Sequence, residues 1–334
     1  MIHEYLQKKI DESKAILRLA ADMSKEYYQK PLIITYSGGK DSDVMLQMTL
    51  ECLDPDEFEV MNSHTTVDAP ETVYYIRDKF KELEELGVKT TINYAHYKDG
   101  SPMTMWNLIE NKQIPPTRLA RYCCAKLKET SAPNRFIALG VRKAESAGRK
   151  GRDVFATRGK TKYEAYYYYY SHVKEVFEDD KERRKLGGVD NPNEPGVWDC
   201  MMISKAKKKD ELLCNPIYEW LDNEIWTFIH DRKMKYNPLY DQGFSRVGCI
   251  GCPMAGTQVW ELEKYPKYKQ NYINAFDRML KKRKAAGKDD VTEREGLQKW
   301  TDGEAVYRWW INDTSIPGQM SLLDYEEEKP NESD

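Results

Sequence analysis

The spacing of hydrophobic and polar residues predicts alternating helices and strands in the first half of the chain. Residues 1–30 carry apolar side chains near helical spacing, with charges between them, and predict an amphipathic helix. Short apolar runs then alternate with helical periodicity, which is typical of βαβ units. We therefore expect an α/β fold with a doubly wound, mostly parallel sheet that binds ligands at the carboxyl ends of its strands. Strands are predicted at 32–36, 59–61, 88–94 and 136–140, and helices at about 42–53 and after Pro70.

The pattern changes in the second half. Between about 151 and 210 the periodicity is lost, which predicts an insertion or a mobile lid. Five consecutive tyrosines at 166–170 are expected to form a half-buried strand, with base stacking as the alternative. Regular structure resumes at 212–217, and a helix follows at about 222–232 with Asp222 as its expected N-cap. Beyond it the chain is predicted to be a helical C-terminal extension.

A glycine-rich turn follows the first predicted strand directly. Residues 37–42 read Ser-Gly-Gly-Lys-Asp-Ser, and Gly38 and Gly39 have no Cβ to keep a ligand away from the backbone. The helix that begins near Asp41 and Ser42 offers N–H groups and a positive dipole end to an anion. The spacing of a Walker loop is absent. The pattern therefore predicts a phosphate cradle of another type, and the alternative is an ordinary strand-to-helix turn.

Composition places limits on the class of protein. The chain has 334 residues, of which 40% are hydrophobic and 32% charged, enough for one large or two modest folded domains. No apolar run approaches the roughly 20 residues of a membrane span, and the N-terminal segment lacks the apolar core of a secretory signal. We therefore expect a cytoplasmic protein with no membrane partner. The net charge of −3 decides little about nucleic acid, but residues 142–162 are strongly basic and suit either phosphate contacts or a solvated loop.

Four of the seven cysteines suggest metal chemistry. Cys249 and Cys252 form a Cys-x-x-Cys pair, which in a reducing compartment is more often a metal or redox site than a disulfide. Cys123 and Cys124 are adjacent, so both can face one centre only on a helical or kinked backbone. Soft thiolates suit zinc or an iron–sulfur cluster. The spacing leaves both open, together with unligated thiols, while Cys52 is expected in the core.

Taken together, these motifs resemble the phosphoadenosine phosphosulfate (PAPS) reductase-like branch of the PP-loop ATP pyrophosphatases. The tandem Cys-Cys with a later Cys-x-x-Cys is similar to the ligand set of the adenylylsulfate reductases and of the DNA phosphorothioation proteins DndC and SspD, and the absence of a C-terminal nucleophilic cysteine makes DndC and SspD the better fit. The resemblance covers about residues 30–255. It rests on Ser37–Ser42, Asp68–Thr72, Tyr122–Lys128, Gly140–Ser146, Asn237–Gly243 and Gly248–Cys252.

The resemblance implies that ATP is cleaved between its α and β phosphates. Lys40, Asp41 and Arg142 are the implied catalytic residues, with Asp41 also an implied Mg²⁺ ligand. Arg142, Lys143 and Arg149 are expected to bind the phosphate substrate, since arginine holds phosphate bidentately. The residues implied to hold the nucleotide are Ser37, Gly38, Gly39, Asp41, Ser42, Asp68, Glu71 and Thr72. Those implied to hold a [4Fe–4S] cluster are Cys123, Cys124, Cys249 and Cys252.

One departure separates the branches of the family. Sulfonucleotide reductases carry a C-terminal nucleophilic cysteine, whereas no cysteine follows Cys252 here. We therefore expect an ATP pyrophosphatase and sulfurtransferase for DNA phosphorothioation, partnered by a cysteine desulfurase and other DNA-modification proteins. The alternatives are a tRNA thiolation enzyme, a non-catalytic nucleotide-sensing module, and an adenylylsulfate or PAPS reductase in which Cys200 or Cys214 is the nucleophile. The expected segments are a helix at 1–30, a PP-loop nucleotide-binding and sulfurtransferase domain at 31–255, helices at 256–323 and a disordered acidic tail at 324–334.

Overall fold

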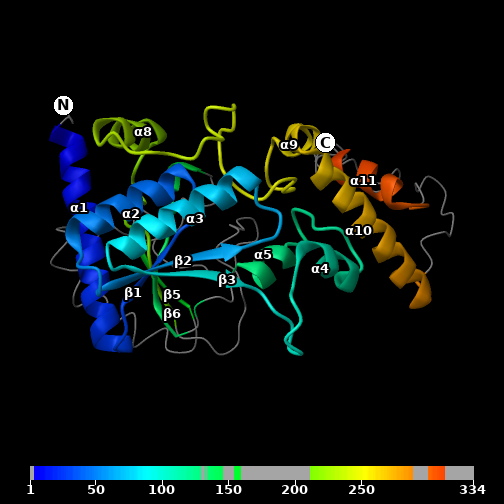
Figure 1. Cartoon of the computed structure of the whole chain (residues 1–334), viewed down its shortest axis with the longest axis horizontal. Coiled ribbons are helices and arrows are strands. Elements are labelled where there is room, and N and C mark those ends of the chain that lie inside the picture. The colour runs from blue at the N-terminus through cyan, green and yellow to red at the C-terminus, as the bar shows by residue number, and fades with distance from the viewer. Residues whose placement is uncertain are drawn as a thin grey trace, which may run out of the picture. The chain divides into compact units, whose positions relative to one another are not determined.

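The computed structural model describes residues 4–128, 132, 134–145, 154–158, 211–288 and 300–312 (Figure 1). The chain divides into two compact units. Unit 1 comprises Met1–Pro102 and Cys124–Gly248, and unit 2 comprises Met103–Cys123 and Cys249–Asp334. The domain boundaries expected from the sequence remain a prediction, and the structure adds that residues 103–123 group with the C-terminal helices.

A six-stranded sheet forms the centre of unit 1, with the order β3-β2-β1-β4-β6-β5 (Figure 1). Neighbouring strands are parallel except for β5, which runs antiparallel to β6 at the edge. This confirms the predicted mostly parallel α/β fold. The chain adds β2 and β3 on one side of β1 and then crosses to the other side for β4, so the strand order reverses between β1 and β4. The strands are β1 Leu32–Thr35, β2 Phe58–His64, β3 Lys89–Tyr94, β4 Phe136–Ala138, β5 Phe155–Arg158 and β6 Glu211–Cys214.

The central strands are apolar because both faces of the sheet are covered. Leu32, Ile33 and Ile34 of β1 are completely buried. Ile34 aligns with Ala138 of β4, and Ala138 aligns with Cys214 of β6. Cys214 is therefore a core residue of the sheet, and its burial raises the pKa of its thiol.

The expectation of an insertion starting at about 151 is wrong at its beginning. β5 follows at Phe155–Arg158, and Val154 and Phe155 are buried. Phe155 aligns with Cys214, so this short strand completes the sheet. Four residues give too short a pattern to show periodicity, which is why the sequence did not reveal it. The five tyrosines, Cys200 and the acidic tail lie outside the described residues.

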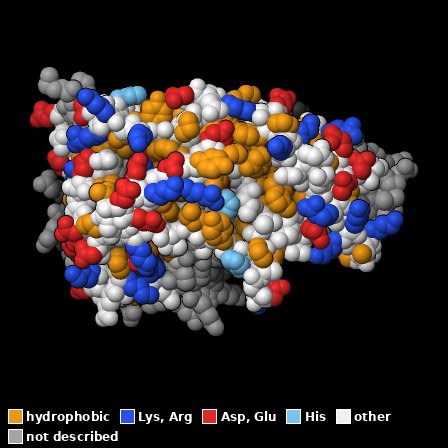
Figure 2. Space-filling view, viewed as in Figure 1, with side chains coloured by type: hydrophobic (Ala, Val, Ile, Leu, Met, Phe, Trp, Pro, Cys, Tyr) orange, Lys and Arg blue, Asp and Glu red, His pale blue; other side chains and the backbone are white. Residues whose placement is uncertain are grey.

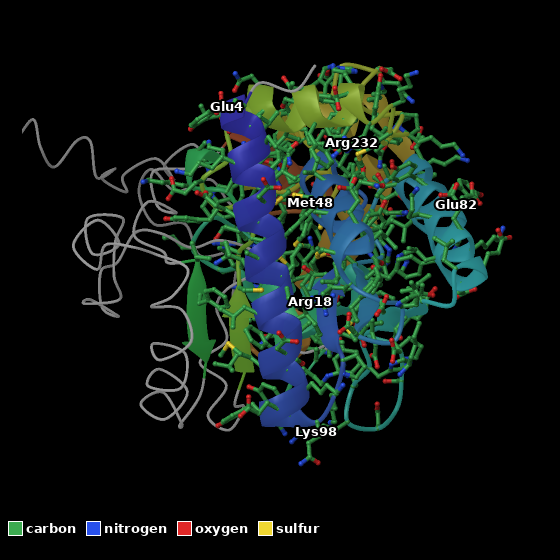
Figure 3. All side chains as sticks on the ribbon, turned by 90° about the vertical axis from the view of Figure 1, so that its left-hand side faces the viewer. Glu4, Arg18, Met48, Glu82, Lys98 and Arg232 are labelled. Carbon is green, nitrogen blue, oxygen red and sulfur yellow. The ribbon has the colours of Figure 1, made fainter. Side chains whose placement is uncertain are left out.

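Four long helices of unit 1 flank the sheet. α1 packs on α2 and on β4 and β6, while α2 also packs on α8; Figure 3 shows α1 running from Glu4 past Arg18. Val44, Met45 and Met48 of α2 are buried, and Cys52 is half-buried against the same core, as expected. The helices are α1 Glu4–Met23, continued by the π-helical turn η1 Ser24–Tyr28, then α2 Lys40–Cys52, α3 Pro70–Glu85 and α8 Asp222–Asp231.

Unit 2 is helical, which confirms the predicted helical C-terminal region. α10 packs on α4, α9 and α11. Its aromatic core contains Tyr272, Phe276 and Trp310, and the Trp310 ring lies 4.6 Å from Tyr272 and 5.4 Å from Phe276 between centroids. The bounds are α4 Met105–Lys112, α9 Gln258–Lys264, α10 Pro266–Ala285 and α11 Gly303–Asn312, with α5 Tyr122–Leu127 at the junction of the units.

The surface carries charges of both signs. Figure 2 shows Lys and Arg side chains interspersed with Asp and Glu on the visible face, in keeping with the net charge of −3. Within the described ranges, no helix combines the length and apolar character that crossing a membrane requires.

Candidate phosphate-binding site

The glycine-rich loop lies at the carboxyl edge of the sheet, where the strand order reverses. It follows β1, and the segment after β4 lies beside it. Contact between the two is close, because a Cβ added at Gly140 would lie 3.3 Å from the backbone nitrogen of Ser42. Open α/β sheets bind ligands at such a position. The fold therefore places the residues predicted for nucleotide binding where a ligand is expected.

Gly38 shapes the loop. Its φ of +71° is in the left-handed region, and a Cβ there would lie 2.9 Å from Cγ1 of Ile76. The buried Asn237 side chain fixes this turn, because its Nδ2 donates to the Gly38 carbonyl at 3.0 Å and to the Thr72 hydroxyl at 3.1 Å. Thr72, which the resemblance implied to contact the nucleotide, is 2% exposed. Here it joins α3 to the loop through Asn237.

The N-terminus of α2 faces the same edge. Gly39 is its N-cap and, being a glycine, has no side chain with which to cap the helix. Ser42 donates its hydroxyl to the Gly39 carbonyl at 2.8 Å, and its oxygen lies 3.2 Å from the Ser37 hydroxyl. The Lys40 N–H donates to the Tyr240 hydroxyl at 2.9 Å. The positive end of the helix dipole thus adds to the cationic side chains beside it.

Two cations and two carboxylates meet at this helix start. Lys40 Nζ lies 3.1 Å from Asp222 Oδ1, and Arg142 Nη2 donates to the same oxygen at 2.8 Å. Arg142 Nε donates to Asp41 Oδ1 at 2.5 Å. The Lys40 and Arg142 side chains are only 6% and 4% exposed, whereas that of Asp222 is 59% exposed. We call these four residues the ion network.

The expected role of Asp222 as an N-cap is wrong. Leu221 is the N-cap of α8, and the Glu224 carboxylate accepts a hydrogen bond from its backbone N–H at 2.6 Å. Asp222 is the first helical residue and pairs with Lys40 and Arg142 instead. Burial raises the pKa of Asp222, but its hydrogen bonds and the nearby positive charges outweigh this and leave its pKa below the usual value.

The other described residues predicted for the site lie between β2 and α3, in α3 and in the turn after β4. The Asp68 carboxylate accepts from the Thr65 N–H at 2.8 Å, and Glu71 is half-buried in the first turn of α3. Lys143 belongs to the short 3₁₀ turn η2 Lys143–Glu145, where its Nζ lies 3.8 Å from Glu219. Arg149 lies outside the described residues.

The predicted cysteines occupy two segments. Cys123 and Cys124 are on the helix α5, as a shared centre requires. In unit 2, burial raises the pKa of the Tyr272 hydroxyl, and the electrostatic influence of Cys123, Cys249 and Cys252 raises it further. In the part of the chain that the structure describes, no three His, Cys, Asp or Glu side chains form a group that could hold one metal ion.

Sequence reasoning missed the roles of Asp222, Asn237 and Tyr240. Asn237 and Tyr240 belong to a motif that carried the family resemblance, which was the only available signal. Their partners, Gly38 and Lys40, lie about 200 positions earlier in the chain. A pattern along the sequence cannot reveal a hydrogen bond over such a separation.

A buried carboxyl group lies behind the loop. Asp43 is 3% exposed, and the Tyr36 hydroxyl donates to its Oδ1 at 2.5 Å. Burial raises the pKa of Asp43 to about 7, although the hydrogen bond from Tyr36 acts in the opposite direction. The folded protein therefore retains a proton on Asp43 at pH values where the unfolded chain has lost it.

The variant Asp43→Asn should remove a pH dependence of stability. The pKa of Asp43 is higher in the folded state than in the unfolded chain. Its contribution to stability is therefore fully present at pH values below the ordinary pKa of 3.8, and it is lost as the pH rises toward about 7. Between pH 4 and 7 the free energy of unfolding of the wild type should fall relative to the variant by up to about 1.4 kcal/mol per pH unit. Urea denaturation at several pH values measures this. The exposed Asp78→Asn is the control, and parallel curves for wild type and Asp43→Asn would contradict the assignment.

Comparison with known proteins assigns the family. The family model of the phosphoadenosine phosphosulfate reductase domain matches residues 31–255. An uncharacterized protein of Methanocaldococcus jannaschii is 23% identical over 307 residues, covering 90% of this chain, and the chain spans 61% of that relative's length.

Two solved structures are similar to this one. The PAPS reductase from Candida auris, in a phosphate complex, has 13% identity and a TM-score of 0.42, and the match covers 75% of this chain and 96% of that one. The U34-tRNA thiolase NcsA from Methanococcus maripaludis, with its [4Fe–4S] cluster, has 15% identity and a TM-score of 0.39. That match covers 86% of this chain and 82% of the thiolase chain. The family model, which matches most of the chain, decides the assignment. The chain belongs to the phosphoadenosine phosphosulfate reductase domain family.

Proposed function

We propose that this protein is an ATP pyrophosphatase that adenylates a DNA backbone phosphate for sulfur insertion, in the manner of the phosphorothioation proteins that its motifs resemble. The observation that carries the proposal is the pair of buried cations, Lys40 and Arg142, beside the start of α2, where the N-cap is a glycine. A buried cation and a helix N-terminus both stabilise an anion. Membership of a nucleotide-binding family makes the phosphates of ATP the anion that we assign to this place.

The first step transfers adenylate to the acceptor. A non-bridging oxygen of the DNA phosphate attacks the α-phosphorus of ATP, and the bond from that phosphorus to the bridging oxygen breaks. Pyrophosphate leaves with the electron pair, and the acceptor oxygen becomes part of a good leaving group, AMP. Lys40, the backbone N–H groups of the loop and the dipole of α2 would stabilise the negative charge that develops on pyrophosphate.

The ion network suits a site that must hold cations before the substrate arrives. The negative charge of Asp222 compensates the positive charges of Lys40 and Arg142, and the Asp222 side chain is itself largely exposed. An arriving phosphate can therefore take its place without uncovering the cations to solvent. Asp41 would contribute a carboxylate to Mg²⁺, an ion that binds to one or two carboxylates together with substrate phosphates. When bound, Mg²⁺ would neutralise phosphate charge.

The second step brings in sulfur. We propose a cysteine desulfurase partner whose persulfide attacks the activated phosphorus and displaces AMP, leaving a phosphorus–sulfur–sulfur link. A thiol then cleaves the sulfur–sulfur bond, so that the phosphorothioate is released and two thiols become one disulfide. Cytoplasmic thiol reductants would then reduce that disulfide to two thiols. Other DNA-modification proteins would select the target.

The cysteine set fits a soft metal centre by its chemistry. Cys123, Cys249 and Cys252 all act electrostatically on the Tyr272 hydroxyl in unit 2, and Cys124 follows Cys123 on one helix. These four residues would hold a [4Fe–4S] cluster, because thiolates are its usual ligands. Such a cluster supplies a site for sulfur or for electrons.

Sulfonucleotide reduction is the second candidate, because the matching family model carries the name of that reaction. It needs a cysteine nucleophile, and Cys214 does not suit this role because it is completely buried in β6. Sulfite release from adenylylsulfate or PAPS would establish this candidate. Sulfur transfer to tRNA instead of DNA would correct the acceptor, and ATP binding without cleavage would indicate a nucleotide sensor.

The variant Lys40→Ala should lower pyrophosphate release from ATP in the presence of DNA by about 100-fold or more, because one preorganised charge at the leaving group is lost. Coupled detection of pyrophosphate measures the rate. Lys81→Ala, which removes an exposed lysine of α3, is the matched control and should keep the wild-type rate. Equal rates for Lys40→Ala and wild type would refute the assignment of the loop.

Cys249→Ser should lower the iron content of anaerobically purified protein and the broad visible absorption of a cluster, because one of four thiolate ligands is lost. Iron and zinc are counted by elemental analysis. Cys52→Ser is the control, since Cys52 packs in the core of unit 1, and it should retain the wild-type iron content. Zinc without iron in the wild type would contradict the cluster.

A further inference from the structure

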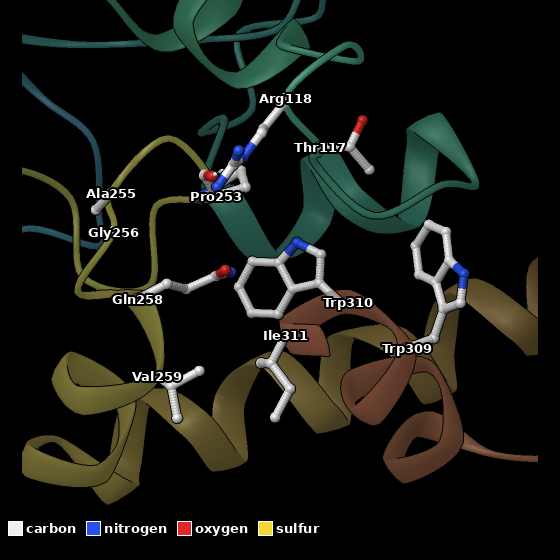
Figure 4. Close-up of a pocket in the computed structure, with 10 residues that line it drawn as sticks. All are labelled: Thr117, Arg118, Pro253, Ala255, Gly256, Gln258, Val259, Trp309, Trp310 and Ile311. Carbon is white, nitrogen blue, oxygen red and sulfur yellow. Dashed lines mark hydrogen bonds between the residues drawn. The ribbon is translucent and has the colours of Figure 1, made fainter. Parts of the chain in front are cut away.

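Unit 2 contains a small cavity that the proposed chemistry does not use. Its volume is about 130 Å³, and residues 117–118, 253, 255–256, 258–259 and 309–311 contribute to its wall (Figure 4). Figure 4 shows Arg118 and Pro253 on one side of it, with Trp310 and Gln258 opposite them. Pro253, one of the wall residues, directly follows Cys252 in the sequence. The cavity therefore adjoins the segment that carries the Cys-x-x-Cys pair.

Three side chains of the wall donate hydrogen bonds to backbone carbonyls. Trp310 is 4% exposed, and its indole N–H donates to the Pro116 carbonyl at 2.5 Å. The ring is therefore held in place and offers the cavity a flat carbon surface. Arg118 Nε donates to the Pro253 carbonyl at 3.1 Å, which ties the guanidinium to the same wall. Gln258 Nε2 donates to the Gly251 carbonyl at 3.2 Å.

The size and chemistry of the cavity select the class of ligand. A cavity of roughly 150 Å³ accepts one benzene-sized ring, so this one has room for a single planar ring and none for a peptide helix or strand. An indole and a guanidinium plane both stack on aromatic rings. A fixed amide offers hydrogen bonds to the edge of a heterocycle. These three features together suit a nucleobase better than an aliphatic chain.

The rim of the cavity suits a polymer rather than a free base. Val259, which contributes to the wall, is 41% exposed, and its neighbour Trp260 on α9 is 39% exposed. Lys264 Nζ lies 5.2 Å from the centre of the Trp260 ring and adds positive charge to the same helix. Aromatic surface combined with positive charge is the usual composition of a single-strand binding surface.

We propose that this cavity binds one unstacked base of the nucleic-acid strand that accepts sulfur. The proposal rests on the proposed function in one respect, since it takes the acceptor to be a nucleic acid. A base held between Arg118 and Trp310 would place its strand near Cys249 and Cys252, which precede Pro253 in the same unit. The cavity would thereby present the acceptor to the sulfur-handling part of the chain.

The test obstructs the cavity without disturbing the fold. Gly256 is an exposed residue of the cavity wall, and a Cβ added there meets nothing within 4 Å, so Gly256→Leu should add an apolar side chain at the edge of the cavity with little strain. The matched control is Ala286→Leu, which adds the same side chain at an exposed position after α10. Arg118→Lys is a second variant, because it keeps the charge and removes the stacking plane.

Binding of a short fluorescein-labelled single-stranded oligothymidylate is followed by anisotropy. Loss of stacking on one base should raise the Kd of Gly256→Leu about fivefold or more above that of the wild type. Arg118→Lys should also raise the Kd. Ala286→Leu should bind as the wild type does, and unchanged melting temperatures should confirm that all variants fold. Wild-type affinity in Gly256→Leu would overturn the proposal. Thymidine monophosphate that binds as tightly as the oligonucleotide would also overturn it, because the ligand would then be a free nucleotide.

Pyrophosphate release separates the two proposals. If Gly256→Leu binds the oligonucleotide as the wild type does while DNA-dependent pyrophosphate release persists, the base pocket is refuted and the proposed function stands. If the wild-type protein releases no pyrophosphate, the proposed function fails. If Gly256→Leu nevertheless binds the oligonucleotide more weakly than the wild type does, the base pocket stands.

Discussion

The pairing of Lys40 and Arg142 with Asp41 and Asp222 is the interaction on which the candidate phosphate site depends. Two cations that are almost completely buried would each be costly without a partner, because removal from water disfavours the charged form. The carboxylates that compensate them come from α2 and from the start of α8. The network thus joins the segment after β4 to two helices, and it keeps positive charge beside the loop at Ser37–Ser42.

The same network explains how a buried site can remain accessible to a ligand. Asp222 is the exposed member, and its pKa is lowered mainly by the two cations against the effect of burial. A phosphate group can offer Lys40 and Arg142 the same type of oxygen. The loop geometry does not depend on this exchange, since Asn237 and the steric limits at Gly38 fix it separately. Charge and shape at the site therefore have different origins.

Much of the fold could be predicted because it depends on local patterns. The apolar run at 32–34 and the helical face of Val44, Met45 and Met48 are properties of neighbouring residues, and the structure confirms both. β5 could not be predicted, since its pairing with β6 joins segments more than 50 positions apart. The role of Asp222 was mistaken for the same reason: it stands where an N-cap is common, but its partners are Lys40 and Arg142. Within the site, the sequence indicated the chemistry, and tertiary contacts decided the partners.

The identity of the products formed from ATP tests the central claim most directly. Phosphorus NMR of ATP incubated with the wild-type protein, DNA and a persulfide donor distinguishes the two ways of cleaving the nucleotide. The account predicts AMP and pyrophosphate, because the loop and its cations are assigned to a pyrophosphate leaving group. ADP and inorganic phosphate would contradict it, since the charge would then develop on a different leaving group and the loop would have another role.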